Sequence, residues 1–128
     1  MTLRAVTTGG APGAIGPYSQ AIDTGALVFV AGQVGLDPKS GELVEGGVEA
    51  QAERALRNIT AILDACGLTM ADVVKTTVLL ADIEDFGSVN AVYARFVSDP
   101  PPARATYQVA ALPRGALIEI EAIAARVG

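Results

Sequence analysis

Residues 118–124 read Ile118-Glu119-Ile120-Glu121-Ala122-Ile123-Ala124, and their alternation decides which fold we expect. Successive side chains of a β-strand point to opposite faces, so positions 118, 120, 122 and 124 form one wholly apolar face. Glu119 and Glu121 share the other face with Ile123. The pattern predicts a sheet whose apolar face is covered by helices and whose second face, carrying the glutamates, meets something other than bulk water alone.

Two segments have the spacing of amphipathic helices. The apolar positions of residues 48–66 are Ala52, Ala55, Leu56, Ile59, Ile62, Leu63 and Cys66. Gly67 is the expected left-handed C-terminal cap of this helix. A second helix is expected over residues 85–97, with Asp85 as its N-cap. Its buried side is expected to carry Phe86, Val89, Tyr93, Phe96 and Val97, and the prolines at 100–102 end it.

The remaining segments are rich in strand-forming residues. Strands are expected at residues 27–33, 73–80, 104–111 and 116–124. Residues 37–41 form an expected turn that closes a hairpin with residues 42–44, and residues 112–115 are expected to close the last hairpin. The order of elements predicts an α+β fold in which two helices lie on one face of a single sheet.

Arg104, Thr106 and Gln108 share one face of the strand that precedes the glutamate strand. We expect that face to be the one that carries the glutamates. If residues 113 and 114 centre a hairpin, Arg104 lies opposite roughly Ile123, and about four residues separate it from Glu119, or roughly 13 Å. Such a separation is too long for one small site within a hairpin. If these two residues cooperate, we expect them to meet across a subunit boundary.

Composition excludes several kinds of site. The chain has 128 residues, which fit one domain spanning 1–128, and it contains no histidine and a single cysteine, Cys66. A catalytic triad with histidine, a histidine-ligated metal and an intrachain disulfide are therefore excluded. Cys66, at the end of the first helix, is expected to be a small buried hydrophobic residue.

The charge and hydropathy of the chain indicate its partners. The net charge is −5, which opposes binding to a nucleic-acid backbone. No apolar run approaches the roughly 18 residues of a membrane span, and no signal segment is evident, so we expect a cytoplasmic protein. Apolar residues make up 51% and charged residues 18% of the chain, although its many alanines contribute to the first figure. This balance favours a homo-oligomer.

Arg104 and Glu119 are the candidate functional pair. The guanidinium of arginine binds a carboxylate through two parallel hydrogen bonds, and a glutamate in an apolar strand can have a raised pKa and can position or deprotonate water. Together they suit the attack of water on a small substrate that carries a carboxylate. The alternative is a structural ion pair between subunits, and the spacing alone favours neither.

Three further residues are weaker candidates. Tyr18 follows Gly16-Pro17 in an expected rigid turn, although a lone tyrosine in such a place usually packs on a neighbour. Gly32 could expose a backbone N–H to a ligand or could mark a β-bulge, and the bulge is the simpler interpretation. Asn90 lies beside the apolar stripe of the second helix, where solvent exposure is the default expectation.

Several motifs, in order along nearly the whole chain, resemble the Rid/YjgF family of reactive-intermediate deaminases. The matching stretches are residues 14–21, 31–33, 75–78, 89–90, 102–104 and 118–122, together with Phe86. The resemblance implies a chorismate-mutase-like fold, a homotrimer with sites in the clefts between subunits, and no metal or organic cofactor. The implied reaction is hydrolysis of 2-enamino and 2-imino acids, such as 2-aminoacrylate and 2-iminopropanoate, to 2-keto acids and ammonia.

The resemblance also implies roles for individual residues. Arg104 matches the arginine that binds the substrate carboxylate, and Glu119 matches the glutamate that orders the attacking water. The positions that match other residues around the substrate are Tyr18, Gly32, Asn90 and Thr106. Well-known members carry serine where this chain has Ala31 and cysteine where it has Thr106. The cysteine contacts substrate partly through its backbone N–H, which Thr106 retains.

Other activities remain open at this stage. The chain could be a noncatalytic trimer that binds small carboxylates, or a deaminase of an aminomuconate-type compound. A ribonuclease that inhibits translation is a further possibility within the family, but the acidity of the chain and its lack of histidine argue against it.

Overall fold

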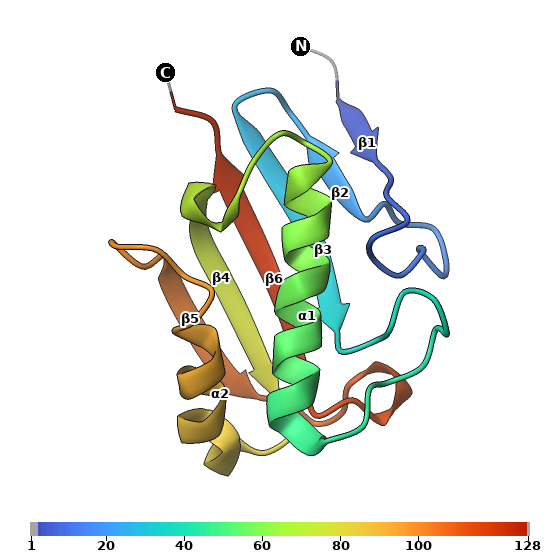
Figure 1. Cartoon of the computed structure of the whole chain (residues 1–128), viewed down its shortest axis with the longest axis vertical. Coiled ribbons are helices and arrows are strands. Elements are labelled where there is room, and N and C mark those ends of the chain that lie inside the picture. The colour runs from blue at the N-terminus through green and yellow to red at the C-terminus, as the bar shows by residue number, and fades with distance from the viewer. Residues whose placement is uncertain (1–2, 128) are drawn as a thin grey trace.

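The computed structural model describes residues 3–127 and has helices on one face of a mixed sheet (Figure 1). The strands are β1 (Arg4–Val6), β2 (Ala21–Asp23), β3 (Leu27–Val34), β4 (Val73–Leu80), β5 (Ala103–Gln108) and β6 (Ile118–Ala125). They lie in the order β1-β2-β3-β6-β4-β5, and only the β4–β5 pair is parallel. The predicted α+β class is confirmed.

The helices are α1 (Gly47–Asp64) and α2 (Phe86–Tyr93), and both lie in front of the sheet in Figure 1. Short 3₁₀ turns occur at η1 (Met70–Asp72), η2 (Ile83–Asp85) and η3 (Pro113–Gly115). In residues 3–127, no helix has the length and apolarity that crossing a membrane requires.

The core lies between α1 and the apolar face of β6, as the sequence predicts. Every apolar residue predicted for the stripe of α1 is buried, and Gly67 adopts the expected left-handed conformation with φ of 74°. On β6, Ile118, Ile120 and Ala124 are buried beneath the helices. Burial also raises the pKa of the Cys66 thiol, which fits its expected role as a core residue.

α2 is shorter than predicted. It begins at Phe86, directly after η2, and ends at Tyr93 rather than at residue 97. Asp85 occupies the N-cap position, but its side chain makes no capping hydrogen bond. The chain beyond Tyr93 tightens into i to i−3 hydrogen bonds at Arg95 and Phe96, which explains the early end. Phe86, predicted to be buried, is 39% exposed.

The predicted hairpin between the last two strands is wrong. β6 does not pair with β5, because β4 lies between them and pairs with both. The segment β4–α2–β5 is a crossover unit in which a helix connects parallel strands. β6 instead fills the centre of the sheet between β3 and β4, where its apolar face is best buried. The turn at residues 112–115 therefore belongs to a connection from β5 to β6 that crosses β4, and it does not close a hairpin with β5.

The turn at residues 37–41 is confirmed, since Gly41 N–H donates to the Asp37 carbonyl at 2.8 Å. The hairpin predicted to follow it is reduced to a single bridge between Leu36 and Leu43.

Candidate active site

The carboxyl group of Glu119 lies in a cavity of about 330 Å³ on the face of the sheet away from the helices. The cavity is lined by Pro12, Gly13, Ile15, Tyr18, Gln20, Gly32, Gln33, Val34, Leu36, Pro113, Arg114 and Glu119. Its apolar side chains are those of Pro12, Ile15, Val34, Leu36 and Pro113. Tyr18, Gly32 and Glu119, three of the residues predicted from the sequence, thus share one cavity, which we call the β6 half-site.

Gly32 lies at an irregularity in β3, where the register with β6 shifts between Val30 and Gln33. The bulge that the sequence suggested is therefore present, and it brings the β3 backbone against Glu119. A β-carbon at residue 32 would lie 2.6 Å from Glu119 Oε2 and 2.9 Å from its Cδ. Glycine is needed here so that the carboxyl group can lie over the strand.

The wall of the cavity opposite β3 is a loop held by buried hydrogen bonds. Gln20, which is 4% exposed, accepts from Thr8 N–H at 2.7 Å and donates to the Pro12 carbonyl at 2.9 Å. Tyr18 follows Gly16, whose φ is 129°, and the Tyr18 hydroxyl accepts a hydrogen bond from Ile15 N–H at 3.2 Å. The predicted turn therefore presents the tyrosine ring to the cavity.

The surroundings of Glu119 shift the pKa of its carboxyl group. Burial, and secondarily the neighbouring Glu121 carboxylate, raises the pKa of Glu119 above its ordinary value. Within residues 3–127 Glu119 forms no ion pair. A carboxyl group in this state can exchange protons with water at a higher pH than an exposed glutamate can.

Arg104 lies elsewhere, on the edge strand β5. Its register partner on β4 is Thr76, whose partner on β6 is the buried Ala122, so Arg104 faces the helices. The guanidinium lies over the rings of Tyr93, at 4.8 Å, and Phe86, at 5.3 Å. The Tyr93 hydroxyl is fixed by a buried 2.6 Å hydrogen bond with the Thr76 hydroxyl. The prediction that Arg104 shares a face with the glutamates is wrong.

Arg104, Thr106 and Asn90 form a second group, the β5 half-site. Thr106 also faces the helices, and its Oγ1 is buried without a hydrogen-bond partner in residues 3–127. Asn90 is half-buried on α2, one turn from both Phe86 and Tyr93, so it lies on the helix face that meets Arg104. In the described part of the chain, the Arg104 guanidinium forms no ion pair.

The two half-sites do not meet within one chain. β4 and β6 separate Arg104 from the cavity of Glu119, and the two side chains lie on opposite faces of the sheet. The register estimate that placed them roughly 13 Å apart along a hairpin no longer applies. The expectation that one chain cannot bring them together is strengthened, because Arg104 and Glu119 are separated by intervening strands and also lie on opposite faces of the sheet.

Sequence reasoning missed several residues that shape these half-sites. Phe86 and Tyr93 were expected on the buried side of α2, and Phe86 was also part of the family resemblance, but neither was given a role at the site. Their rings form the platform for Arg104. Gln20 was recognised only as part of a motif. Its hydrogen bonds to the backbone of residues 8–12 join segments that no local sequence pattern links. Arg114 lines the β6 half-site with φ of 62°, a left-handed conformation that the neighbouring Pro and Gly could only suggest.

Residues 8–126, nearly the whole chain, match the endoribonuclease L-PSP family. The chain belongs to this family. Human 2-iminobutanoate/2-iminopropanoate deaminase is 55% identical over 121 residues, which are 94% of this chain and 88% of the human protein. The resemblance predicted from the sequence motifs is confirmed.

Solved structures of endoribonuclease L-PSP relatives have the same fold. A candidate endoribonuclease from Thermotoga maritima superposes with a TM-score of 0.95 at 51% identity, over 98% of each chain. The YjgF gene product of E. coli gives a TM-score of 0.92 at 44% identity, over 97% of this chain and 99% of that one. E. coli TdcF, solved with bound serine, gives 0.92 at 42% identity, with the same coverage.

Proposed function

We propose that this chain hydrolyses 2-imino and 2-enamino acids to 2-keto acids and ammonia. The observation that carries the proposal is a pair of half-buried charges, Glu119 and Arg104, neither of which has an ion-pair partner in residues 3–127. Unpaired charges in such places are costly and are typical of functional sites. Relatives that are 55% and 56% identical, from human and mouse, are named 2-iminobutanoate/2-iminopropanoate deaminase, which supports this reaction.

In the proposed reaction, Arg104 holds the substrate carboxylate through two parallel hydrogen bonds, and Tyr93 and Phe86 fix its guanidinium plane. Glu119 accepts a proton from water while the water oxygen bonds to the imine carbon, and the electron pair of the C=N bond moves to nitrogen, which takes a proton from the solvent. The resulting carbinolamine releases its hydroxyl proton to the solvent, and a C=O bond forms as the C–N bond breaks. The electron pair leaves with nitrogen, which takes the proton held by Glu119 and departs as ammonia.

This chemistry needs neither histidine nor a metal centre. Imines hydrolyse in water unaided, so orienting the substrate and one water molecule supplies the required part of the barrier. An enamine such as 2-aminoacrylate enters the same path after protonation of its terminal carbon converts it to the imine.

We further propose that each site forms between two chains of a homotrimer, with the β5 half-site of one chain facing the β6 half-site of the next. The two half-sites lie on opposite faces of the sheet in one chain, which supports a site that needs a second copy. The uncovered sheet face also carries large exposed apolar side chains, Phe29 at 43% and Tyr107 at 57%. The buried, unpartnered Oγ1 of Thr106 is a candidate donor to the substrate or to the adjoining chain.

The direct test is keto-acid release from 2-iminopropanoate, generated in the assay by an amino-acid oxidase. We expect the purified protein to accelerate release above the uncatalysed rate in proportion to its concentration. An unchanged rate at micromolar protein would contradict the proposal and favour a noncatalytic carboxylate-binding protein. The same preparation is expected to leave single-stranded RNA intact, because an acidic chain without histidine is poorly suited to phosphodiester cleavage.

A further inference from the structure

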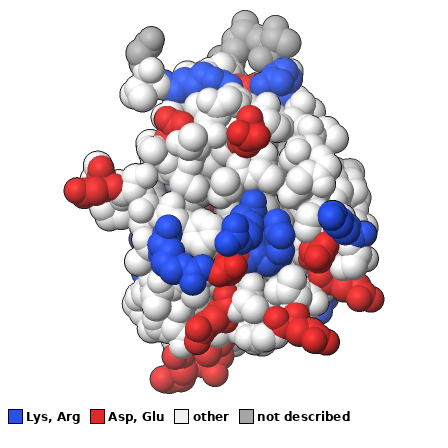
Figure 2. Space-filling view, viewed as in Figure 1, with Lys and Arg blue, Asp and Glu red and all other residues white. Residues whose placement is uncertain are grey.

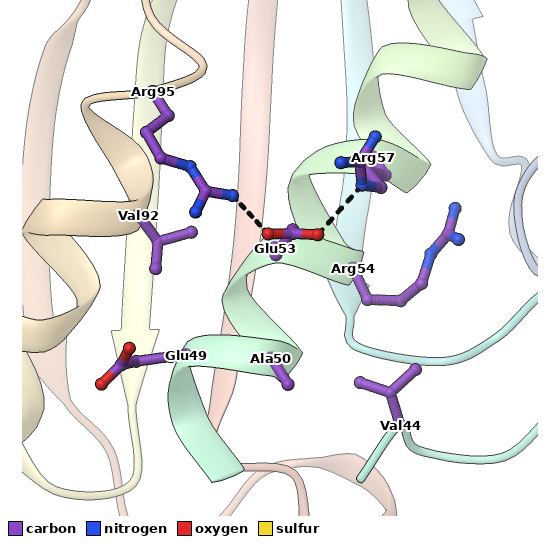
Figure 3. Close-up of a pocket in the computed structure, with 8 residues that line it drawn as sticks. All are labelled: Val44, Glu49, Ala50, Glu53, Arg54, Arg57, Val92 and Arg95. Atoms are coloured by element: carbon purple, nitrogen blue, oxygen red, sulfur yellow. Dashed lines mark hydrogen bonds and ion pairs between the residues drawn. The ribbon is translucent and has the colours of Figure 1, made fainter. Parts of the chain in front are cut away.

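Three arginines gather on the helical face of the molecule, and none of them belongs to either half-site. Arg54 and Arg57 come from α1, and Arg95 follows the end of α2. They line a cavity of about 390 Å³ together with Val44, Glu49, Ala50, Glu53 and Val92 (Figure 3). Figure 2 shows these basic side chains as a blue band across an otherwise mixed or neutral face. We call Arg54, Arg57 and Arg95 the arginine cluster.

The arginine cluster is incompletely neutralised by the protein. Glu53 is the shared partner of Arg57, at 3.3 Å, and of Arg95. Arg54 forms no ion pair in residues 3–127. Glu49 likewise makes none within the described part of the chain, and in Figure 3 its carboxylate points away from the three guanidinium groups. Three of the nine basic residues of a chain with net charge −5 thus lie around one cavity, and two of them share the single paired carboxylate, Glu53.

Arg54 is held in position from within the core. Its Nε donates at 3.0 Å to Oδ1 of Asn58, which is fully buried. The Asn58 amide group in turn donates to the Leu36 carbonyl at 3.0 Å. This chain of hydrogen bonds fixes the guanidinium of Arg54 and leaves its two terminal nitrogens without a protein acceptor in the described residues. A pre-oriented guanidinium loses less conformational entropy when it binds an anion.

The space beside the arginine cluster can take an organic group as well as an anion. A second cavity, of about 510 Å³, shares Arg57 and Arg95 with the first and is lined by Thr60, Ala61, Asp64, Met70 and Phe96. Arg57 and Arg95 flank the Phe96 ring, each at 5.8 Å. Apolar side chains from both cavities therefore lie next to the guanidinium groups.

We propose that the arginine cluster binds a small phosphate ester, with the phosphate on the guanidinium groups and the organic part against the adjoining apolar side chains. A monocarboxylate would offer Arg57 and Arg95 only the kind of ion pair that they already form with Glu53. A phosphate dianion carries more charge and more acceptor oxygens, so it can also engage Arg54. A polynucleotide fits poorly, because the rest of this acidic surface repels a phosphate backbone.

Calorimetry with phenyl phosphate and with benzoate, which share a ring and differ in the anion, tests this proposal. We expect one phenyl phosphate per chain, bound at least 10-fold more tightly than benzoate at low ionic strength. The variant Arg54→Gln is expected to weaken phenyl phosphate binding at least five-fold, while Lys39→Gln, which removes an exposed charge that lines neither cavity, changes it less than two-fold. Equal weakening by both variants, or no binding by the wild type, would overturn the proposal.

Two more variants locate the ligand and identify its class. Arg104→Ala is expected to leave phenyl phosphate binding unchanged, and a loss of binding there would assign the ligand to the β5 half-site instead. Glu53→Gln removes the competing carboxylate and is expected to tighten binding at least two-fold, whereas weaker binding would contradict an anion site. Tighter binding of single-stranded RNA than of phenyl phosphate, lost in Arg54→Gln, would replace the small ligand by a polynucleotide.

Discussion

Replacing Arg104 with alanine is expected to lower kcat/KM for 2-iminopropanoate by roughly 100-fold or more, because a bidentate contact with the substrate carboxylate is lost. The effect should appear mainly in KM if the contact is equal in substrate and transition state, and in kcat if it orients the imine carbon toward water. Steady-state rates of keto-acid release measure both constants.

The controls separate binding from folding. Arg104 lies on the rings of Tyr93 and Phe86, so its removal could disturb the edge of the sheet. Arg104→Lys keeps the charge but not the planar fork, and it is expected to recover only a small part of the activity. The melting temperature of each variant should stay close to that of the wild type, and the exposed Lys39→Ala should keep full activity. Full activity in Arg104→Ala would remove the arginine from the proposed site.

Replacing Glu119 with glutamine is expected to lower kcat by about 100-fold or more, since the group that accepts and returns the proton of water is lost. The amide keeps the shape of the side chain over Gly32, so binding of a 2-keto acid product should be nearly unchanged. A loss of turnover with retained product binding distinguishes an enzyme from a noncatalytic carboxylate-binding protein. Retained turnover in Glu119→Gln would mean that another group activates the water.

The raised pKa of Glu119 also gives a stability signature. Burial penalises the ionised carboxyl group in the folded state, so the wild type loses stability as pH rises from the ordinary glutamate pKa, about 4.3, through the raised value. The glutamine variant has no such dependence. Its melting temperature is therefore expected to equal or exceed that of the wild type at pH 7, with the difference vanishing below about pH 4. Wild-type activity should fall over the same interval as pH decreases.

The local patterns predicted most of the fold. The stripe of α1, the limits of β4 and the alternation of β6 depend on the spacing of apolar side chains within one segment, and the structure confirms them. β6 lies between β3 and β4. That position depends on which strand buries the most apolar surface there, so it requires a comparison of all the strands. A turn motif between two neighbouring strands does not contain this information. The turn at residues 112–115 suits a hairpin as well as a longer connection, and it led to the wrong pairing.

The wrong hairpin between the last two strands also limited the prediction of the candidate site. Tyr18, Gly32 and Glu119 were named from motifs and lie around one cavity. Arg104 was assigned to the glutamate face from the alternation of its strand, and its separation from Glu119 was estimated from an assumed hairpin register. The parallel β4–β5 pair shows that both inferences were wrong. A strand, a helix and a further strand in sequence order, with the helix on one face, indicate a parallel pair. Applied to residues 73–108, this rule would have ruled out the hairpin from which the register was estimated.

The most direct test of a site built from two chains is to combine two inactive variants. Arg104→Ala and Glu119→Gln chains, co-expressed or refolded together, should form mixed assemblies in which some interfaces join an intact arginine to an intact glutamate. Random assembly would restore about a quarter of the wild-type sites, and hence about a quarter of the activity. No recovery in assemblies shown by native mass spectrometry to contain both chains would contradict a site shared between subunits.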